Sequence, residues 1–417
     1  MQNIHEILKT YWGYDQFRPL QAEIIQSIAS GRDTLALMPT GGGKSLTFQV
    51  PAMAMEGICI VVTPLIALMK DQVENLKKQN VSAAAIFSGM THAEILKTLE
   101  NAVFDAYKFL YVSPERLSTE IFIKKVTQMN VSMIAVDEAH CISQWGYDFR
   151  PSYLRIAEIR SLMPDVPVLA LTATATAEVV DDIQVQLQFK QKNVFRKSFH
   201  RHNLIYVVRN AENKNDQLFK ILKSVSGTSV VYVRNRKKTK EIADLLNQNG
   251  IKADYFHAGL KNETKDERQA RWKSNETRVI VATNAFGMGI DKPDVRTVVH
   301  MDLPDSLEAY FQEAGRAGRD EKKAFAVLLF NKSDETKLRK RIADTFPPKE
   351  KVKEVYTALG AYYQIGIGSG LDRTFVFDIN EFCGRFHFSI LVAHSSPKIL
   401  RHAGYVELTD EPASSSM

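Results

Sequence analysis

The 417-residue sequence predicts an α/β protein with two tandem doubly wound parallel-sheet domains, followed by a smaller helical region. Two observations predict this fold class. Short apolar, β-branched runs alternate with amphipathic helical stretches over residues 34–329, as in parallel sheets that are covered by helices. A polar stretch at 209–216 interrupts this alternation, which then restarts. We therefore expect a first domain at 1–208, a second domain at 209–335 and a third region at 336–417.

Each of the two domains contains five runs with the length and composition of a buried strand. In the first domain they lie at residues 34–38, 58–63, 109–112, 133–136 and 168–171. In the second they lie at residues 228–233, 253–256, 279–282, 297–300 and 325–329. The two halves share this layout but no repeated motif, which indicates two related folds and not a sequence repeat.

The third region changes character. A basic helical run at 337–341 precedes a helix that is expected to start behind the prolines at 347–348. Asp378 is expected to cap the next helix, and another helix at 397–403 is expected to stop at a glycine before a strand at 405–408. This order of elements predicts a partial winged helix.

Composition limits the class of protein. Apolar residues make up 45% and charged residues 24%, which is ordinary for a globular protein, and no apolar run approaches the roughly 18 residues that span a bilayer. The N-terminus lacks the layout of a secretory signal, so we expect a cytoplasmic protein without membrane contact. Cys59, Cys141 and Cys383 lie far apart, so free thiols and no zinc are expected. The net charge of +6 is compatible with a polyanionic partner but decides nothing, and the tail at 411–417 is expected to be disordered.

A glycine-rich loop follows the first expected strand and precedes an apolar helical pattern. Its glycines would let backbone N–H groups turn toward phosphate, Lys44 would supply a cation, and the Ser45 hydroxyl could reach Mg²⁺. The strict pattern has glycine at the position of Met38, so a glycine-rich turn with an incidental lysine is the alternative. The predicted nucleotide-binding residues of this loop are Thr40, Gly41, Gly42, Gly43, Lys44 and Ser45.

An acidic pair strengthens the phosphate-binding hypothesis. Asp137 and Glu138 follow the expected strand at 133–136, and we expect that strand to neighbour the strand before the glycine loop. Asp137 would then hold Mg²⁺, while Glu138 would orient and deprotonate an attacking water. Two carboxylates in a solvated loop are the alternative. His140 is not expected to bind zinc, because no second His or Cys stands at ligand spacing.

Two arginines in the second half complete the predicted site. Arg316 and Arg319 are three residues apart, hence near one helix face if the helix continues through them. A forked, permanently charged guanidinium suits the charge that develops on a transferring phosphoryl group. The neighbouring glycines weaken a helix, so a loose basic turn that binds backbone phosphate is the alternative.

With these residues in place, the chain resembles superfamily-two helicases and, more closely, the RecQ family, whose two sheet domains are RecA-like. The resemblance covers roughly residues 11–329, and its motifs follow the family's order. The matching stretches are GYDQFRPLQ (13–21), PTGGGKS (39–45), TPLIALMKDQV (63–73), SPERL (113–117), DEAHCISQWGYDFRP (137–151), LTATAT (171–176), HAGL (257–260), ATNAFGMGIDKPDVR (282–296) and QEAGRAGRD (312–320).

The resemblance implies roles for further residues. Tyr14 would stack on adenine, Gln21 would read its hydrogen-bonding edge, and Arg18 would complete the pocket. The stretch at 143–150 is similar to the family's aromatic-rich loop, which couples DNA contact to hydrolysis. Its glycine, aspartate and following proline favour a loop over a buried strand. The implied DNA-coupling residues are Trp145, Tyr147, Phe149 and Arg150.

The resemblance also implies an activity: an ATP- and Mg²⁺-dependent DNA helicase that moves 3′ to 5′ on single-stranded DNA and unwinds partly duplex DNA in repair and recombination. We expect a monomer. Tyr147 stands where the family usually has histidine, and the family's four-cysteine zinc module is absent, so the chain is either a branch without that module or a piece of a longer protein. The alternatives are an RNA helicase of the DEAH kind and a module that uses ATP only as a switch to clamp DNA.

Overall fold

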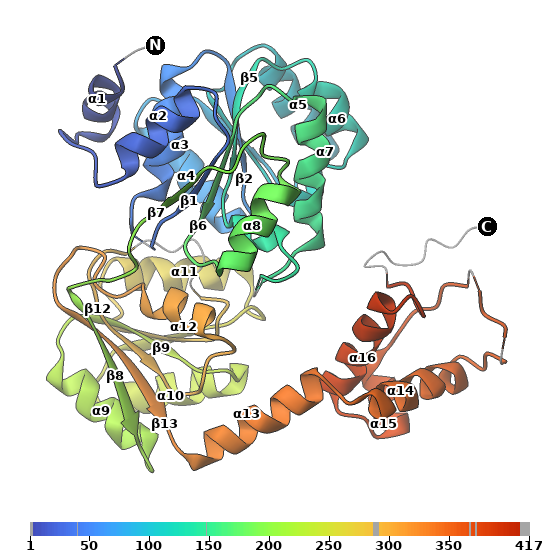
Figure 1. The fold of residues 1–417 in the computed structure, drawn as a ribbon. Coiled ribbons are helices and arrows are strands. Elements are labelled where there is room, and N and C mark those ends of the chain that lie inside the picture. Colours follow the sequence, from blue (N-terminus) through green and yellow to red (C-terminus); the bar gives the residue numbers. More distant parts are fainter. Residues whose placement is uncertain are drawn as a thin grey trace. The chain divides into compact units, whose positions relative to one another are not determined.

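The computed structural model describes residues 3–39, 41–146, 148–286, 292–366, 368–371 and 373–408. The chain divides into a first unit, Met1–Leu329, which contains both sheets, and a second unit, Phe330–Met417. Figure 1 shows the strands and helices of each unit. Among the described residues, we find no helix with both the length and the apolar character needed to cross a membrane.

The first sheet has seven strands in the order β3-β4-β2-β5-β6-β1-β7. Their bounds are β1 Thr34–Leu37, β2 Ile58–Val62, β3 Ala83–Ile86, β4 Phe109–Val112, β5 Val131–Val136, β6 Val168–Thr172 and β7 Val194–Arg196. All six pairings within this sheet are parallel. The five expected strands are confirmed, whereas β3 and β7 were not predicted.

Helices cover both faces of the first sheet (Figure 1). One face packs against α2 (Gln21–Ala29), α3 (Lys44–Ala54) and α4 (Ile66–Lys78), and the other against α5 (His92–Val103), α6 (Glu120–Val126), α7 (Arg155–Leu162) and α8 (Ala177–Gln186). Successive strand residues point to opposite faces, so Leu35 enters one apolar core and Ala36 enters the other. A short helix, α1 (Ile4–Ile7), precedes these elements.

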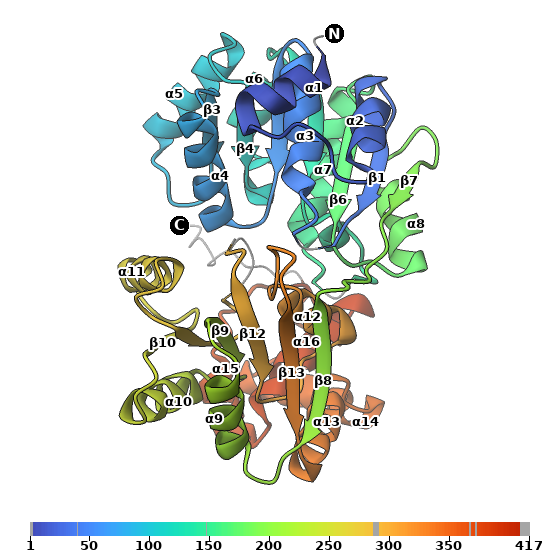
Figure 2. The same cartoon turned by 90° about the vertical axis from the view of Figure 1, so that its left-hand side faces the viewer.

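The second sheet lies in the same unit and has six strands in the order β10-β11-β9-β12-β13-β8. Their bounds are β8 Leu204–Asn210, β9 Thr228–Tyr232, β10 Ala253–Phe256, β11 Val279–Ala282, β12 Val295–His300 and β13 Ala324–Phe330. Helices α9 (Lys214–Ser224) and α10 (Arg236–Gln248) contribute to one core, while α11 (Asn262–Lys273) and the segment from α12 (Leu307–Ala314) contribute to the other. Figure 2 shows β12, β13 and β8 side by side. The expected strands are confirmed, and β8 is an addition.

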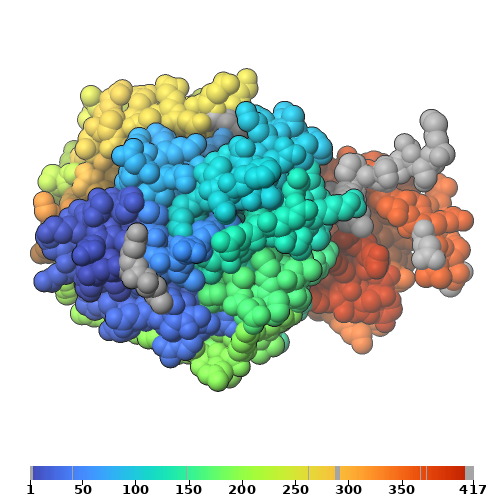
Figure 3. All heavy atoms as spheres, turned by 90° about the horizontal axis from the view of Figure 1, so that it is seen from above, coloured from blue at the N-terminus to red at the C-terminus, as the bar shows by residue number. Residues whose placement is uncertain are grey.

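One ion pair joins the two halves of the first unit. Nζ of Lys273, at the end of α11, lies 3.1 Å from Oδ2 of Asp71 in α4. In Figure 3 the yellow atoms of the α11 region border the blue atoms of the α4 region. The two sheet domains therefore contact each other through helix side chains that lie far apart in the sequence.

The second unit is helical. It contains α13 (Lys332–Thr345), α14 (Lys349–Tyr362), α15 (Ile379–Phe386) and α16 (Ile390–His402). A small apolar core lies around the buried side chain of Phe382. Oδ1 of Asp378 accepts hydrogen bonds from the backbone N–H groups of Asn380 (2.8 Å) and Glu381 (3.1 Å), which confirms the expected cap.

Two expectations for this unit were wrong. Helix α16 begins at Ile390 rather than near residue 397, because Ser389 caps it and Pro397 is accommodated inside it. Residues 405–408 form no strand: a strand needs a partner for its backbone groups, and none pairs with this segment among the described residues. The tail at 411–417 lies outside the described residues.

Candidate active site

The phosphate loop, residues 39–45, connects β1 to α3 in the expected order of strand, glycine loop and helix. Gly41 and Gly43 have φ angles of +79° and +75°, a region that favours glycine. A Cβ on Gly43 would lie 2.4 Å from Nε2 of Gln21, so any other residue there would displace the Gln21 side chain. Lys44 and Ser45 begin α3, and Thr40 lies outside the described residues.

Two residues of the expected adenine pocket bond to this loop. Nη1 of Arg18 donates to the carbonyl of Gly41 at 2.7 Å, and Nε2 of Gln21 donates to the carbonyl of Gly43 at 3.0 Å. Oε1 of Gln21 accepts from the backbone N–H of Arg18 at 2.8 Å. Tyr14 is 54% exposed. If Gln21 binds adenine, its side-chain amide must therefore give up the hydrogen bond to the Gly43 carbonyl. The adenine-binding roles of Tyr14, Arg18 and Gln21 stay predictions.

The acidic pair follows β5, but β5 does not neighbour β1. Strand β6 lies between them, so the expectation that these two strands are neighbours was wrong. The order of strands along the sequence does not show which strands pair in the sheet. Oδ1 of Asp137 accepts from the backbone N–H of Glu138 at 2.9 Å. Burial and the Glu138 charge raise the pKa of Asp137 to about 6, while the charge of Lys44 opposes that rise. Lys44 thus acts electrostatically on Asp137 across the intervening strand.

Glu138 has an unusual backbone and side chain. Its φ of +49° lies in the left-handed region, a conformation that costs about 1–3 kcal/mol and clusters at functional sites. Its Oε2 atom is buried and has no hydrogen-bond partner among the described residues, although Nδ1 of His140 lies 3.4 Å away. A carboxylate oxygen in this state fits a bound water or a hydrated cation, as the nucleotide site requires.

His140 connects the acidic pair to the LTATAT segment at 171–176. Its Nδ1 atom lies 2.9 Å from Oγ1 of Thr172, which also bonds to the backbone of Thr174. Burial lowers the pKa of His140 to about 4, so the imidazole is neutral at neutral pH. From the sequence, His140 was not expected to bind metal and was given no other role; the LTATAT match was the signal that could have indicated this contact.

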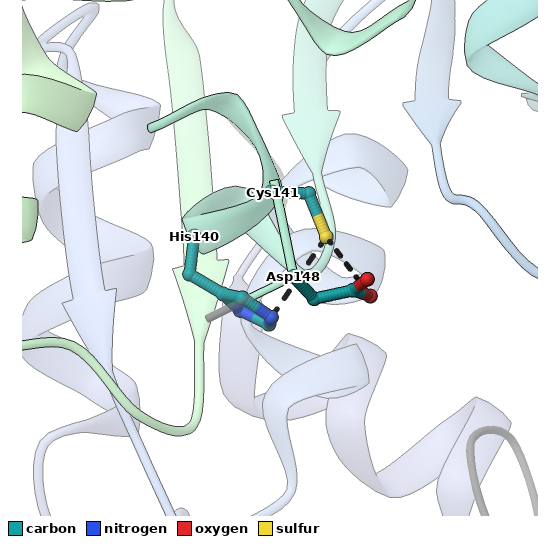
Figure 4. A group of neighbouring side chains, drawn as sticks. All are labelled: His140, Cys141 and Asp148. Carbon is teal, nitrogen blue, oxygen red and sulfur yellow. Dashed lines mark hydrogen bonds between the residues drawn. The ribbon is translucent and has the colours of Figure 1, made fainter. Parts of the chain in front are cut away.

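His140 also lies in a cluster with Cys141 and Asp148, whose potential ligand atoms are within 4.8 Å of one another. Figure 4 shows Sγ of Cys141 between Nε2 of His140 and Oδ2 of Asp148, at 3.8 Å from each. That carboxylate oxygen already accepts from Nη2 (2.9 Å) and Nε (3.2 Å) of Arg150. Because the guanidinium occupies this oxygen, and burial raises the pKa of the Cys141 thiol, the contacts favour a hydrogen-bonded cluster over a metal site.

The aromatic loop, residues 143–150, forms a loop as expected and not a strand. The backbone N–H of Arg150 donates to the carbonyl of Cys141 at 2.8 Å and closes its base. A Cβ on Gly146 would lie 2.4 Å from the His140 carbonyl, so this close turn requires glycine. Trp145 is 74% exposed, Phe149 is half-buried, and Tyr147 lies outside the described residues. The loop therefore presents Trp145 to solvent a few residues from the acidic pair.

The two candidate arginines lie in a turn. Helix α12 ends at Ala314, so it does not continue through both arginines, and Gly318, with φ of +62°, lies in a turn as the neighbouring glycines indicated. Arg316 is buried. A Cβ on Gly41 would lie 3.1 Å from Cγ of Arg319, so Arg319 lies against the phosphate loop. We call residues 315–319 the arginine turn.

Known proteins place the chain in the helicase class. The family model described as DEAD/DEAH box helicase matches residues 18–183, and the one described as helicase conserved C-terminal domain matches residues 213–321. A crystal structure of the DUF1998 helicase MrfA bound to DNA superimposes with a TM-score of 0.67 at 18% identity, covering 81% of this chain and 52% of that one. This likeness shows the fold, two RecA-like domains in tandem.

The curated relatives identify the family of helicases to which the chain belongs. The ATP-dependent DNA helicase RecQ of Bacillus subtilis is 43% identical over 339 residues, which cover 80% of this chain and 57% of the relative. The probable ATP-dependent DNA helicase RecS of the same organism is 39% identical over 369 residues, covering 85% of this chain and 74% of the relative. The chain belongs to the RecQ family of superfamily-two helicases. It spans little more than half the length of RecQ from Bacillus subtilis and from Pasteurella multocida.

Proposed function

We propose that this chain is the motor of an ATP-dependent DNA helicase that translocates 3′ to 5′ on single-stranded DNA and unwinds duplexes during repair and recombination. The observation that carries the proposal is the approach of Arg319, in the arginine turn of the second sheet domain, to Gly41 in the phosphate loop of the first. A nucleotide held at that loop would touch both halves, so its hydrolysis could change their arrangement. Family membership supports DNA as the substrate.

The phosphate loop would bind the nucleotide. Backbone N–H groups of Gly41–Gly43 and the Lys44 ammonium would hold the phosphates, with Thr40 contributing to the loop. The Ser45 hydroxyl and the Asp137 carboxylate would hold Mg²⁺, and the Oε2 atom of Glu138, which makes no hydrogen bond to the described residues, supports a hydrated ligand nearby. The chemistry that Mg²⁺ supplies when bound is neutralisation of charge on the β- and γ-phosphate oxygens. Tyr14, Arg18 and Gln21 would contact adenine.

Three side chains would act on the reaction itself. Glu138 would accept a proton from the attacking water, because its backbone is held in the left-handed region and its Oε2 atom accepts no hydrogen bond from the described residues. Arg316 and Arg319 would stabilise negative charge on the transferring phosphoryl group. The arginine turn belongs to the other half of the unit, so the complete site would exist only when the halves are close.

The aromatic loop would couple DNA contact to hydrolysis. Stacking of a base on an aromatic ring contributes about 1–3 kcal/mol and tolerates any base, as a translocating motor requires. Trp145, Tyr147, Phe149 and Arg150 would supply this contact. The bond between Sγ of Cys141 and Oδ2 of Asp148 connects the loop to the segment that carries Glu138, so displacement of the loop would reach the acidic pair.

Several further properties belong to the same proposal. We propose a monomer in the cytoplasm, with domain bounds near residues 208 and 335 and with no zinc, because Cys383 is the one cysteine beyond Arg319 in the sequence. The proposal is tested by comparing ATP turnover in the presence of single-stranded DNA and of RNA of matched length. Stronger stimulation by DNA is expected, whereas preferential stimulation by RNA would favour the DEAH-type RNA helicase instead.

Changing both Trp145 and Phe149 to alanine is expected to leave basal, DNA-free hydrolysis nearly intact and to remove its stimulation by DNA. The variant is expected to fold because Trp145 is exposed and Phe149 is only half-buried, whereas aromatics lost from a packed core would cost roughly 3–5 kcal/mol each and would unfold most domains. ATP turnover is measured across DNA concentrations, with thermal unfolding to check the fold. The control is Phe104→Ala, which removes an aromatic side chain that is 82% exposed outside the loop. An aggregated double variant, or one still fully stimulated, would remove the loop from the mechanism.

A further inference from the structure

The two sheets are joined by one crossing of the chain. Residues 197–203 connect β7, the last strand of the first sheet, to β8 of the second. This linker carries Arg201 and Asn203, which no motif of the sequence analysis includes. Both side chains contact the arginine turn. Movement of one half against the other could therefore be transmitted through the linker to the candidate catalytic arginines.

Arg201 binds the carbonyl side of the arginine turn. Its Nη1 atom donates to the carbonyl of Gly315 at 3.1 Å, and its Nη2 atom donates to the carbonyl of Ala317 at 2.9 Å and to that of Gly318. These carbonyls follow the end of α12, where helical C=O groups lack intrahelical partners and a cation is favoured. The guanidinium is half-buried, and burial lowers its pKa. One planar guanidinium thus binds three carbonyls of the turn.

Asn203 holds the turn from the same side. Its Nδ2 atom donates to the carbonyls of Gly318 (2.7 Å) and Lys322 (2.9 Å), and its own carbonyl accepts from the N–H of Ala324 at 2.9 Å. A Cβ on Gly318 would lie 2.7 Å from that Nδ2 atom. The approach of linker and turn is so close that glycine is required. Arg316 and Arg319 directly flank Ala317 and Gly318, two of the residues whose carbonyls the linker binds.

We infer that Arg201 is a positioning residue, which fixes the arginine turn to the linker so that Arg316 and Arg319 reach the nucleotide only in one arrangement of the two halves. The inference rests on the proposed function, and it assigns Arg201 no contact with substrate. A guanidinium is needed because a lysine ammonium is a point charge on a flexible stem and cannot present the same planar fork to three carbonyls. Small misplacement of catalytic groups is enough to reduce turnover strongly.

Arg201→Lys tests this role in the full chain. A misplacement of this kind is expected to lower kcat for DNA-stimulated ATP hydrolysis by about 10²-fold. KM for ATP and the affinity for a non-hydrolysable ATP analogue should stay within about threefold of the parent, because the phosphate loop is untouched. The affinity for ADP with aluminium fluoride, which mimics the transferring phosphoryl group, should fall with kcat. If Arg201 had a purely structural role, the variant would lose thermal stability, but kcat would not fall selectively while KM and the affinity for the ATP analogue stayed unchanged.

The chain offers a matched control. Arg278 is also half-buried, and it donates to three carbonyls of another turn: those of Gly227 (3.1 Å), Val225 (2.7 Å) and Leu222. That turn lies at the end of α9 and carries no candidate site residue. Arg278→Lys should therefore show a comparable loss of stability with kcat within about threefold of the parent. A fall in kcat equal to that of Arg201→Lys would overturn the inference.

A second pair of variants separates this inference from the proposed function. If Arg319→Ala keeps full turnover, the arginine turn has no catalytic role, and the inference fails together with that part of the proposed function. If Arg319→Ala is inactive while Arg201→Lys hydrolyses ATP like the parent, the positioning role alone is wrong. Should Arg201→Lys fail to fold, Arg201→Gln, which retains an amide donor for one carbonyl, is held to the same criteria.

Discussion

Replacing Lys44 with alanine is expected to abolish DNA-stimulated ATP turnover, with a fall in kcat of more than about 10²- to 10³-fold, because the phosphates lose their principal cation. The glycine backbone of the phosphate loop is unchanged, so weak nucleotide binding should remain. Steady-state ATPase rates measure the first effect and equilibrium titration with an ATP analogue measures the second.

The control for this variant is Lys124→Ala in α6, where an exposed ammonium pairs with Glu120 at 2.9 Å and no candidate site residue belongs to the helix. It removes the same charge and should leave turnover unchanged. Near-normal DNA-stimulated hydrolysis by Lys44→Ala would show that the glycine-rich loop is a structural turn with an incidental lysine.

Replacing Glu138 with glutamine is expected to retain ATP binding and lose hydrolysis, by about 10²- to 10⁴-fold in kcat. The amide keeps the size of the carboxylate but cannot accept the proton of the attacking water. ATP binding should survive because Oε2 of Glu138 makes no hydrogen bond to the described residues of the parent protein. The substitution therefore removes no such hydrogen bond at that atom.

ATP affinity and single-turnover hydrolysis are measured separately for this variant. Glu158→Gln, at an exposed carboxylate that pairs with Arg155, is the control and should hydrolyse ATP normally. If Glu138→Gln lost nucleotide binding as well as hydrolysis, Glu138 would be a structural residue and the assignment of the general base would fail.

The fold was predictable from the sequence to the extent that strands are continuous apolar runs. β2 (ICIVV) and β9 (TSVVY) are fully buried and rich in β-branched residues, so their composition identifies them. β3 consists mainly of alanine, β7 has three partly exposed residues, and β8 is largely exposed, so none of them carries that signal. These three strands are fixed by pairing with neighbours, which the local sequence does not encode.

Site residues could be predicted from the sequence where the local backbone conformation determines which residue types are present. Glycines at 41 and 43 and the acidic pair after β5 are visible in the sequence because a turn and a strand end impose them. Contacts between distant segments were not visible: Gln21 on the phosphate loop, His140 on Thr172, and Arg201 on the arginine turn. Each depends on strand order and on side-chain packing, which periodicity does not specify.

The central claim is that nucleotide hydrolysis by this chain drives movement along DNA, and ATP-dependent strand separation tests it most directly. Duplexes with a 3′ or a 5′ single-stranded tail are compared under the same conditions, with ATP and with a non-hydrolysable analogue. The account predicts separation of the 3′-tailed duplex with ATP alone and little separation of the 5′-tailed one. Nucleotide-dependent DNA binding without sustained turnover or strand separation would contradict it and would identify an ATP-switched clamp.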